Sequence, residues 1–215
     1  FYLPAIDRES GSSMLDLADK YPDRCIPMIG LHPCSVKSAY TDELFYVEQK
    51  LRERKFAAIG EIGLDYYWDK QYIAEQKKAF EYQIHLANNY SLPIVIHTRE
   101  AMRDTIDLVK ANPVDRKGIF HCFGGSVEEA KEIIDLGFYL GIGGVLTYKK
   151  AGLADVLPHI PLESMVLETD APYLTPVPYR GKRNESSYIP VIARELSKVM
   201  KVSIEEIAEV TSANA

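Results

Sequence analysis

The sequence predicts an α/β fold built on parallel strands, and three observations carry this prediction. Strand-like and helix-like segments alternate from one end of the chain to the other, as they do in a series of βαβ units. The strand-like segments are nearly continuous apolar runs, which suits strands buried on both faces of a sheet. No linker or low-complexity stretch divides the 215 residues, so we expect a single domain over residues 1–215.

The strand signals fall in seven segments: Phe1–Ile6, Cys25–Leu31, Phe56–Leu64, Pro93–Thr98, Lys117–Phe123, Phe138–Val145 and Met165–Glu168. A TIM-type (β/α)8 barrel has eight strands and typically about 250 residues. The chain opens without Met, in what reads as a strand already under way. We therefore predict a barrel with seven strands visible, its first β/α unit upstream and part of its last helix downstream. An open doubly wound sheet is the alternative, but no Gly-rich phosphate-binding turn follows an early strand.

The expected helices lie between these strands and after the last one. Ser126–Glu129 form a capping box that opens a helix through Asp135, and Gly137 ends it. The other helices are expected at Ser10–Lys20, after a Thr41 cap through Leu51, at about residues 71–89, at Glu100–Lys110, Lys149–Leu157 and Tyr188–Met200, and after Ser203. The glycines of Gly141–Gly144 are expected to allow close approach of backbone or ligand. The long loop Ala171–Ser187 is expected to be functional.

Composition narrows the class of protein. A formal charge of −6 argues against a protein that coats duplex DNA with a broad basic surface. A compact metal site remains compatible with that charge, because bound cations reverse the local field. No apolar run approaches the roughly 20 residues of a membrane helix, and no signal-peptide pattern opens the chain. Three cysteines without C-x-x-C spacing predict no disulfide framework and a cytoplasmic location.

Four strand segments lead into a residue that can bind a divalent metal, namely Glu61, His97, His121 and Asp170. Alone, each has an ordinary structural explanation, such as a satisfied histidine or a turn aspartate. In a barrel the C-terminal ends of the strands open on one face, where active sites lie, so the four residues are expected to meet. Two histidines and two carboxylates suit zinc or manganese. A bridging carboxylate would hold two ions about 3.5–4 Å apart.

Further candidates surround these four. His32 ends another strand and can bind metal, hold a phosphate oxygen or cap the turn; we favour a role toward the substrate or behind the ligands over direct ligation. Glu168, two residues before Asp170, either orients the ligands or is a buried core carboxylate. Cys122 should face the opposite side from the adjacent His121.

Two surface features have both a plain and a functional explanation. Tyr66, Tyr67 and Trp68 follow the Glu61 strand and either stack on a nucleobase or pack at the rim of the barrel. The basic segment Arg180–Glu185 is either a solvated surface or a phosphate clamp.

Several motifs together resemble the TatD family of metal-dependent deoxyribonucleases, which belongs to the amidohydrolase-like barrels. Each is weak alone and the combination is highly specific. They are Gly30–Pro33, Gly60–Tyr66, Ile96–Arg99, His121–Gly125 and Leu167–Tyr173, and the similarity continues through Arg180–Glu185 to Thr211–Ala215.

The resemblance implies a distorted TIM barrel with one to three divalent ions (Mg, Mn or Zn). It implies that Glu61 bridges metals, that His97 and His121 bind one ion, and that Asp170 binds the other. Family members also begin with a His-x-His pair on the first strand. That pair is absent among the remaining histidines, which are His32, His85 and His159. Its absence agrees with a first β/α unit upstream of Phe1.

The expected activity is therefore a deoxyribonuclease that cleaves phosphodiester bonds through a metal-activated water. Asp170 is the expected general base, His32 or Arg180 would balance charge on the phosphoryl oxygens, and Tyr66 and Trp68 are candidates for base stacking. The expected substrate is DNA, single-stranded or at strand ends, acted on by a monomer with no membrane partner. Two alternatives stay open: a hydrolase of a small ester, lactone or amide on the same barrel, and a non-catalytic domain that binds metal or nucleic acid.

Overall fold

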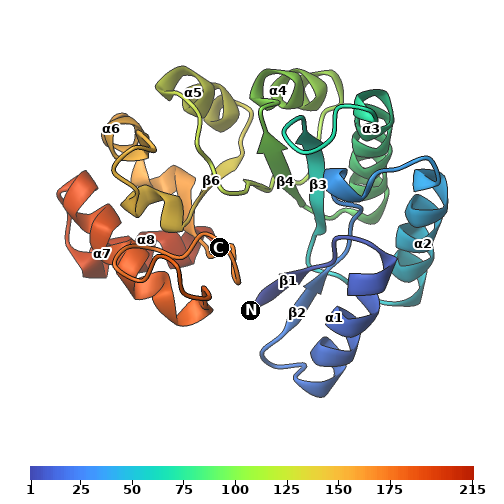
Figure 1. Cartoon of the computed structure of the whole chain (residues 1–215), viewed down its shortest axis with the longest axis horizontal. Coiled ribbons are helices and arrows are strands. Elements are labelled where there is room, and N and C mark those ends of the chain that lie inside the picture. The colour runs from blue at the N-terminus through green and yellow to red at the C-terminus, as the bar shows by residue number, and fades with distance from the viewer. The chain divides into compact units, whose positions relative to one another are not determined.

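The computed structural model describes all residues from Phe1 to Ala215. It consists of two compact units, Phe1–Gly118 and Ile119–Ala215, coloured blue to green and yellow-green to red in Figure 1. The seven predicted strands are all present and alternate with helices, which confirms the expected α/β organisation. No helix of the chain combines the length and the apolar character that a membrane span requires.

The first unit contains two pairs of parallel strands. β1 (Tyr2–Pro4) pairs with β2 (Ile26–Met28), and β3 (Ile59–Asp65) pairs with β4 (Ile94–Arg99). A parallel bridge between Ile29 and Ile59 joins one pair to the other. The helices are α1 (Arg8–Lys20), α2 (Tyr40–Glu53), α3 (Ile73–Tyr90) and α4 (Met102–Ala111). Apolar side chains of β3, β4 and α3 form the core, including the fully buried Ile62, Ile94, Ile96, Phe80 and Ile84.

The second unit contains three parallel strands in sequence order, with β6 (Tyr139–Ile142) between β5 (Ile119–Phe120) and β7 (Met165–Leu167). Its helices are α5 (Val127–Asp135), α6 (Leu153–Val156), α7 (Ile189–Met200) and α8 (Ile204–Asn214). Phe120 and Phe138 meet edge to face with ring centres 5.4 Å apart in its core. Short 3-10 turns complete the two units at Pro33–Ser35, Gly144–Thr147, Leu157–His159, Leu162–Ser164 and Ser186–Tyr188.

Most predicted helix boundaries hold, and two do not. Ser126 and Glu129 form the reciprocal capping box of α5, and Gly137 takes a left-handed φ of 86° just after that helix. Thr41 does not cap α2, because the helix begins one residue earlier at Tyr40. The helix expected at residues 149–157 shortens to α6 and a 3-10 turn. Gly152 takes a left-handed φ of 74° before α6, and Pro158 has no N–H with which to continue the helix.

The candidate metal ligands do not all lie at strand ends. Glu61 and His97 lie inside β3 and β4, because the pairing of these strands runs on to Asp65 opposite Arg99. The register of β3 shifts between Ile59 and Ile62, so Glu61 lies in an irregular part of the strand. His121 directly follows β5, as predicted.

Candidate metal centre

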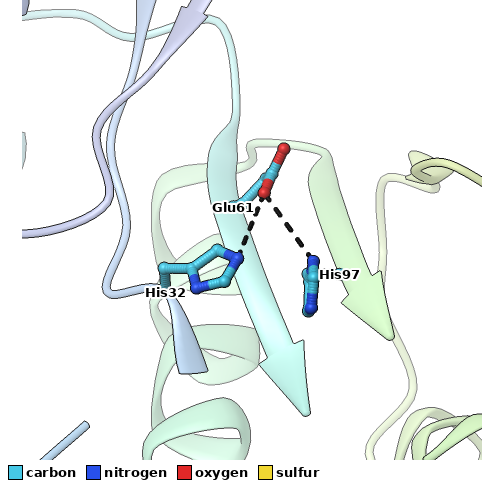
Figure 2. A group of neighbouring side chains, drawn as sticks. All are labelled: His32, Glu61 and His97. Atoms are coloured by element: carbon cyan, nitrogen blue, oxygen red, sulfur yellow. Dashed lines mark ion pairs between the residues drawn. The ribbon is translucent and has the colours of Figure 1, made fainter. Parts of the chain in front are cut away.

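The first unit gathers His32, Glu61 and His97 around one carboxylate oxygen. Figure 2 shows both imidazole rings turned toward Glu61, from the segment after β2 and from β4. Glu61 Oε2 lies 3.4 Å from His32 Nε2 and 4.0 Å from His97 Nδ1. Ligand atoms about 2.1 Å from one ion at tetrahedral angles lie about 3.4 Å apart. The spacing therefore fits a divalent ion. A neutral imidazole binds a metal through its unprotonated nitrogen, so the position of the proton on each ring decides which residues can be ligands.

His97 presents a ligand lone pair because of the residue behind it. Asp65 Oδ2 lies 2.9 Å from His97 Nε2, and the Asp65 side chain is only 1% exposed. Burial alone would raise the pKa of Asp65, but hydrogen bonds from His97 and from the N–H groups of Trp68 and Tyr67 hold it well below its usual value. An ionised carboxylate can only accept, so His97 Nε2 carries the proton.

The other nitrogen of His97 is the one that faces Glu61. Burial lowers the pKa of His97, against the opposing effect of Asp65, so the ring is neutral and Nδ1 holds the lone pair. A carboxylate behind a histidine in this way fixes both the tautomer and the ring orientation of a metal ligand. Glu61 and His97 are thus suited to hold a cation together.

In His32 the nitrogen that faces Glu61 is the protonated one. Its Nδ1 accepts the backbone N–H of Cys34 at 3.1 Å, which makes it the cap of the turn Pro33–Ser35 and confirms the capping alternative. The ring proton therefore lies on Nε2, the atom facing Glu61. His32 is a hydrogen-bond donor at this site, and its catalytic and substrate-binding roles stay predictions. Burial and the nearby Asp65 raise the pKa of the Cys34 thiol to about 12.

The second unit also contains a histidine between two carboxylates, as His97 is between Asp65 and Glu61. His121 Nδ1 lies 2.8 Å from Glu168 Oε2, and His121 Nε2 lies 3.5 Å from Asp170 Oδ1. Glu168 also accepts the backbone N–H of Cys122 at 2.7 Å through its second oxygen. With Nδ1 bonded to the Glu168 carboxylate, Nε2 is the ring nitrogen that can offer a lone pair to a metal, and it faces Asp170. Glu168 has the contacts of a residue that orients a ligand, one of the two roles predicted for it.

The predictions for Cys122 and for the glycine-rich segment Gly141–Gly144 have different outcomes. The expectation that Cys122 faces away from His121 is wrong, since the ligand-type atoms of His121, Cys122 and Glu168 all lie within 4.8 Å of one another. Strand alternation has ended there, because β5 stops at Phe120 and Cys122 takes a left-handed φ of 47°. The close approach of backbone predicted for the glycine-rich segment is confirmed at Gly144, where a Cβ would collide with the Leu174 carbonyl oxygen. At Gly141 a Cβ would collide with the Glu168 carboxylate, which is a side-chain neighbour.

The remaining candidates lie beside these clusters. Tyr66 donates its hydroxyl to Asp104 at 2.8 Å, and Lys77 pairs with the same carboxylate oxygen at 2.7 Å. The guanidinium of Arg180 lies over the Tyr148 ring, 4.1 Å from its centre. The substrate-binding roles of Tyr66 and Arg180 stay predictions.

Each cluster belongs to one unit, so a centre shared by Glu61, His97, His121 and Asp170 also stays a prediction. Within each unit, however, a histidine nitrogen and a carboxylate oxygen lie 3.5–4.0 Å apart, with a second carboxylate bonded to the ring from behind. On a scaffold of parallel strands, this is the kind of ligand pair that metal-dependent hydrolases use.

Comparison with known proteins gives the family. The model of the TatD-related DNase family matches residues 1–215, and the chain belongs to that family. It is 39% identical over 211 residues to the uncharacterised metal-dependent hydrolase YabD of Bacillus subtilis, covering 97% of this chain and 82% of YabD. It is 36% identical over 208 residues to a protein of Edwardsiella piscicida named 3′-5′ ssDNA/RNA exonuclease TatD, covering 94% of this chain and 80% of that protein.

Among solved structures, the TatD homologue YjjV of Escherichia coli superposes with a TM-score of 0.94 at 30% identity, over 99% of this chain and 83% of YjjV. This likeness, with the parallel βαβ units of the chain, confirms the predicted TIM-type α/β fold class.

Proposed function

We propose that this chain is a metal-dependent nuclease that hydrolyses phosphodiester bonds in single-stranded DNA. The observation that carries the proposal is that His32 and His97 direct opposite groups at Glu61: His32 an N–H, and His97 an unprotonated nitrogen. One ring offers a lone pair that suits a cation, and the other offers an N–H that suits an anionic oxygen. A phosphodiester needs both kinds of group. The relative named as an exonuclease of single-stranded DNA and RNA supports the same substrate class.

The proposed roles follow from the contacts. Glu61 with His97, and His121 with Asp170, are the metal ligands, and Asp65 and Glu168 hold the two rings. Divalent cations held there would supply an acidified water and would offset the charge of the phosphate. Asp170, whose side chain is 36% exposed, would accept the proton of the attacking water. His32 Nε2–H, which faces Glu61, would donate to a phosphoryl oxygen as negative charge develops on it.

The test of the proposed base is Asp170→Asn, which keeps the size of the side chain and removes its basicity. General-base catalysis contributes roughly 10²–10⁴-fold, so we expect at least a 100-fold loss of turnover on a labelled single-stranded oligonucleotide. Asp155→Asn, an exposed aspartate of α6 in the same unit, is the control and should keep full activity. Undiminished turnover by Asp170→Asn would remove Asp170 from the role of base.

A substrate panel separates the nuclease from the two alternatives. Single-stranded DNA, duplex DNA, RNA and a set of small esters, lactones and amides are compared with Mg²⁺, Mn²⁺ and Zn²⁺, and again after chelation. The nuclease predicts turnover of single-stranded DNA that chelation abolishes. Turnover of a small ester, lactone or amide without cleavage of DNA would favour the small-molecule hydrolase. Metal binding without any turnover would favour the binding domain.

A further inference from the structure

An exposed aromatic surface with an arginine against it lies at the ends of β3 and β4. Trp68 is 68% exposed and Tyr67 48% exposed, and their rings meet edge to face with centres 4.9 Å apart. The Arg99 guanidinium lies 3.7 Å from the centre of the Tyr67 ring and 5.3 Å from that of Trp68. We refer to these three residues as the Tyr67–Trp68–Arg99 platform. Isolated exposed aromatics are ordinary, but two with a cation held over them form a defined recognition surface.

The platform is anchored by the same carboxylate that orients the metal-ligand candidate His97. Asp65 Oδ1 accepts the backbone N–H groups of Tyr67 at 2.9 Å and Trp68 at 3.1 Å, while its Oδ2 bonds to His97. Asp65 and Arg99 are also partners in the β3–β4 register, and Tyr66 N–H donates to the Arg99 carbonyl at 3.0 Å. The backbone under the platform is therefore fixed relative to His97.

Packing does not account for the platform. Tyr66, the neighbouring aromatic residue, is half-buried and donates its hydroxyl to Asp104, as a structural tyrosine does. Tyr67 and Trp68 instead leave large parts of their rings exposed. The Arg99 guanidinium can stack by its face and still direct its N–H groups at an anion.

We propose that the platform stacks against an unpaired nucleobase of a single-stranded substrate, with Arg99 binding the adjacent backbone phosphate. The proposal rests on the proposed nuclease function and adds a residue-level reason for single-strand preference. A nucleotide offers a flat π face and a phosphate charge close together, which matches two aromatic rings and a guanidinium. Bases in a duplex have covered faces, whereas bases in single strands can be splayed out and stacked on aromatic side chains.

The first test uses the fact that Trp68 is the only tryptophan of the chain. Its fluorescence is titrated, in the presence of Mg²⁺, with oligothymidylate carrying hydrolysis-resistant phosphorothioate linkages. The same linkages without bases, in an abasic oligomer of equal length and charge, provide the control. We expect saturable quenching by oligothymidylate and little by the abasic oligomer. No quenching, or equal quenching by both oligomers, would overturn the proposal.

The second test separates binding from chemistry. Stacking on one aromatic residue is worth roughly 5- to 150-fold in affinity, so Trp68→Ala should raise KM for single-stranded DNA by that factor, with kcat changed far less. Trp68→Phe keeps a stacking ring and should recover most of the loss. The control is Phe45→Ala, which removes an aromatic residue 56% exposed on α2 and should change neither constant.

The outcomes distinguish the platform from the proposed function. An unchanged KM in Trp68→Ala, with DNA cleaved normally, would overturn the platform and leave the nuclease standing. If the chain cleaves no DNA with any metal, the proposed function fails, and the fluorescence titration still reports whether the platform binds bases.

Discussion

Replacing Asp65 with Asn should weaken metal binding without touching any proposed ligand. The two side chains have nearly the same size, so the buried site is not distorted by volume. The Asn carbonyl can still accept the N–H groups of Tyr67 and Trp68, which places the amide NH₂ against His97 Nε2. An NH₂ group donates, so His97 Nε2 must accept and the ring proton moves to Nδ1. The lone pair that faces Glu61 is then lost.

The expected size of this effect follows from the position of Asp65 behind a ligand. Replacing such a partner typically costs 10–100-fold in metal affinity or activity, and we expect a loss of that order, about 1.4–2.7 kcal/mol. Calorimetric titration of the whole chain with Zn²⁺ or Mn²⁺ measures the affinity. Asp69→Asn is the matched control, because that carboxylate pairs with Lys37 at 2.7 Å on the surface and contacts no ligand candidate.

A second measurement separates a changed tautomer from a general loss of structure. Nitrogen NMR of the imidazole rings should show the proton of His97 on Nε2 in the wild type and on Nδ1 in Asp65→Asn. Metal affinity within twofold of the wild type in Asp65→Asn, or an unchanged His97 tautomer, would refute the assignment of Nδ1 as the ligand atom.

Two further predictions concern packing and pH. Gly141→Ala should lower the free energy of unfolding by about 1–3 kcal/mol and weaken metal binding, because its Cβ would displace the Glu168 carboxylate. Gly124→Ala is the control and should be close to neutral, since no atom lies within 4 Å of its Cβ. Urea denaturation measures both variants, and equal losses of stability would contradict the prediction. Asp7 caps α1; burial would raise its pKa, but hydrogen bonds from Ser10 and Ser35 lower it. Because the folded pKa lies below the unfolded value of about 3.9, the stabilisation by Asp7 is present above about pH 4 and is lost as the pH falls. Asp7→Ala should therefore cost about 0.5–2 kcal/mol near neutral pH and less toward pH 2, and a cost that does not change with pH would exclude the ionised cap.

The strands could be predicted because their signal is local. Segments such as Ile94–Ile96 are short runs of β-branched residues, and the structure buries Ile94 and Ile96 fully on one face and Val95 partly on the other. The capping box at Ser126 was predictable for the same reason, since both of its partners lie within one turn. The cap of α2 was not. Thr41 has the right chemistry, but the helix begins at Tyr40, with Ala39 at the N-cap position and no side-chain cap.

The part of the candidate site that sequence did not reveal depends on strand register. Asp65 ends an apolar run, as Glu61 and His97 do, but its partner follows only from the pairing of β3 with β4. That pairing places Gly63 against His97 so closely that a Cβ would collide with the His97 carbonyl oxygen. The glycine is visible in the sequence, but the strand it approaches is not. An apolar run that ends in Asp was the available signal for Asp65, and alone it does not distinguish a turn aspartate from a residue that orients a ligand.

The three histidines show the limit of local inference most directly. In the sequence they are equivalent: each follows or lies within an apolar run. In the structure their roles diverge, because a backbone N–H can only donate and a carboxylate can only accept. The N–H behind His32 comes from Cys34, two positions away, and a turn cap was among its predicted roles. The carboxylates behind His97 and His121 lie 32 and 47 positions away. The atom that decides whether a histidine offers a metal its lone pair is therefore local only for His32, the one histidine of the three that directs its N–H at the neighbouring ligand carboxylate.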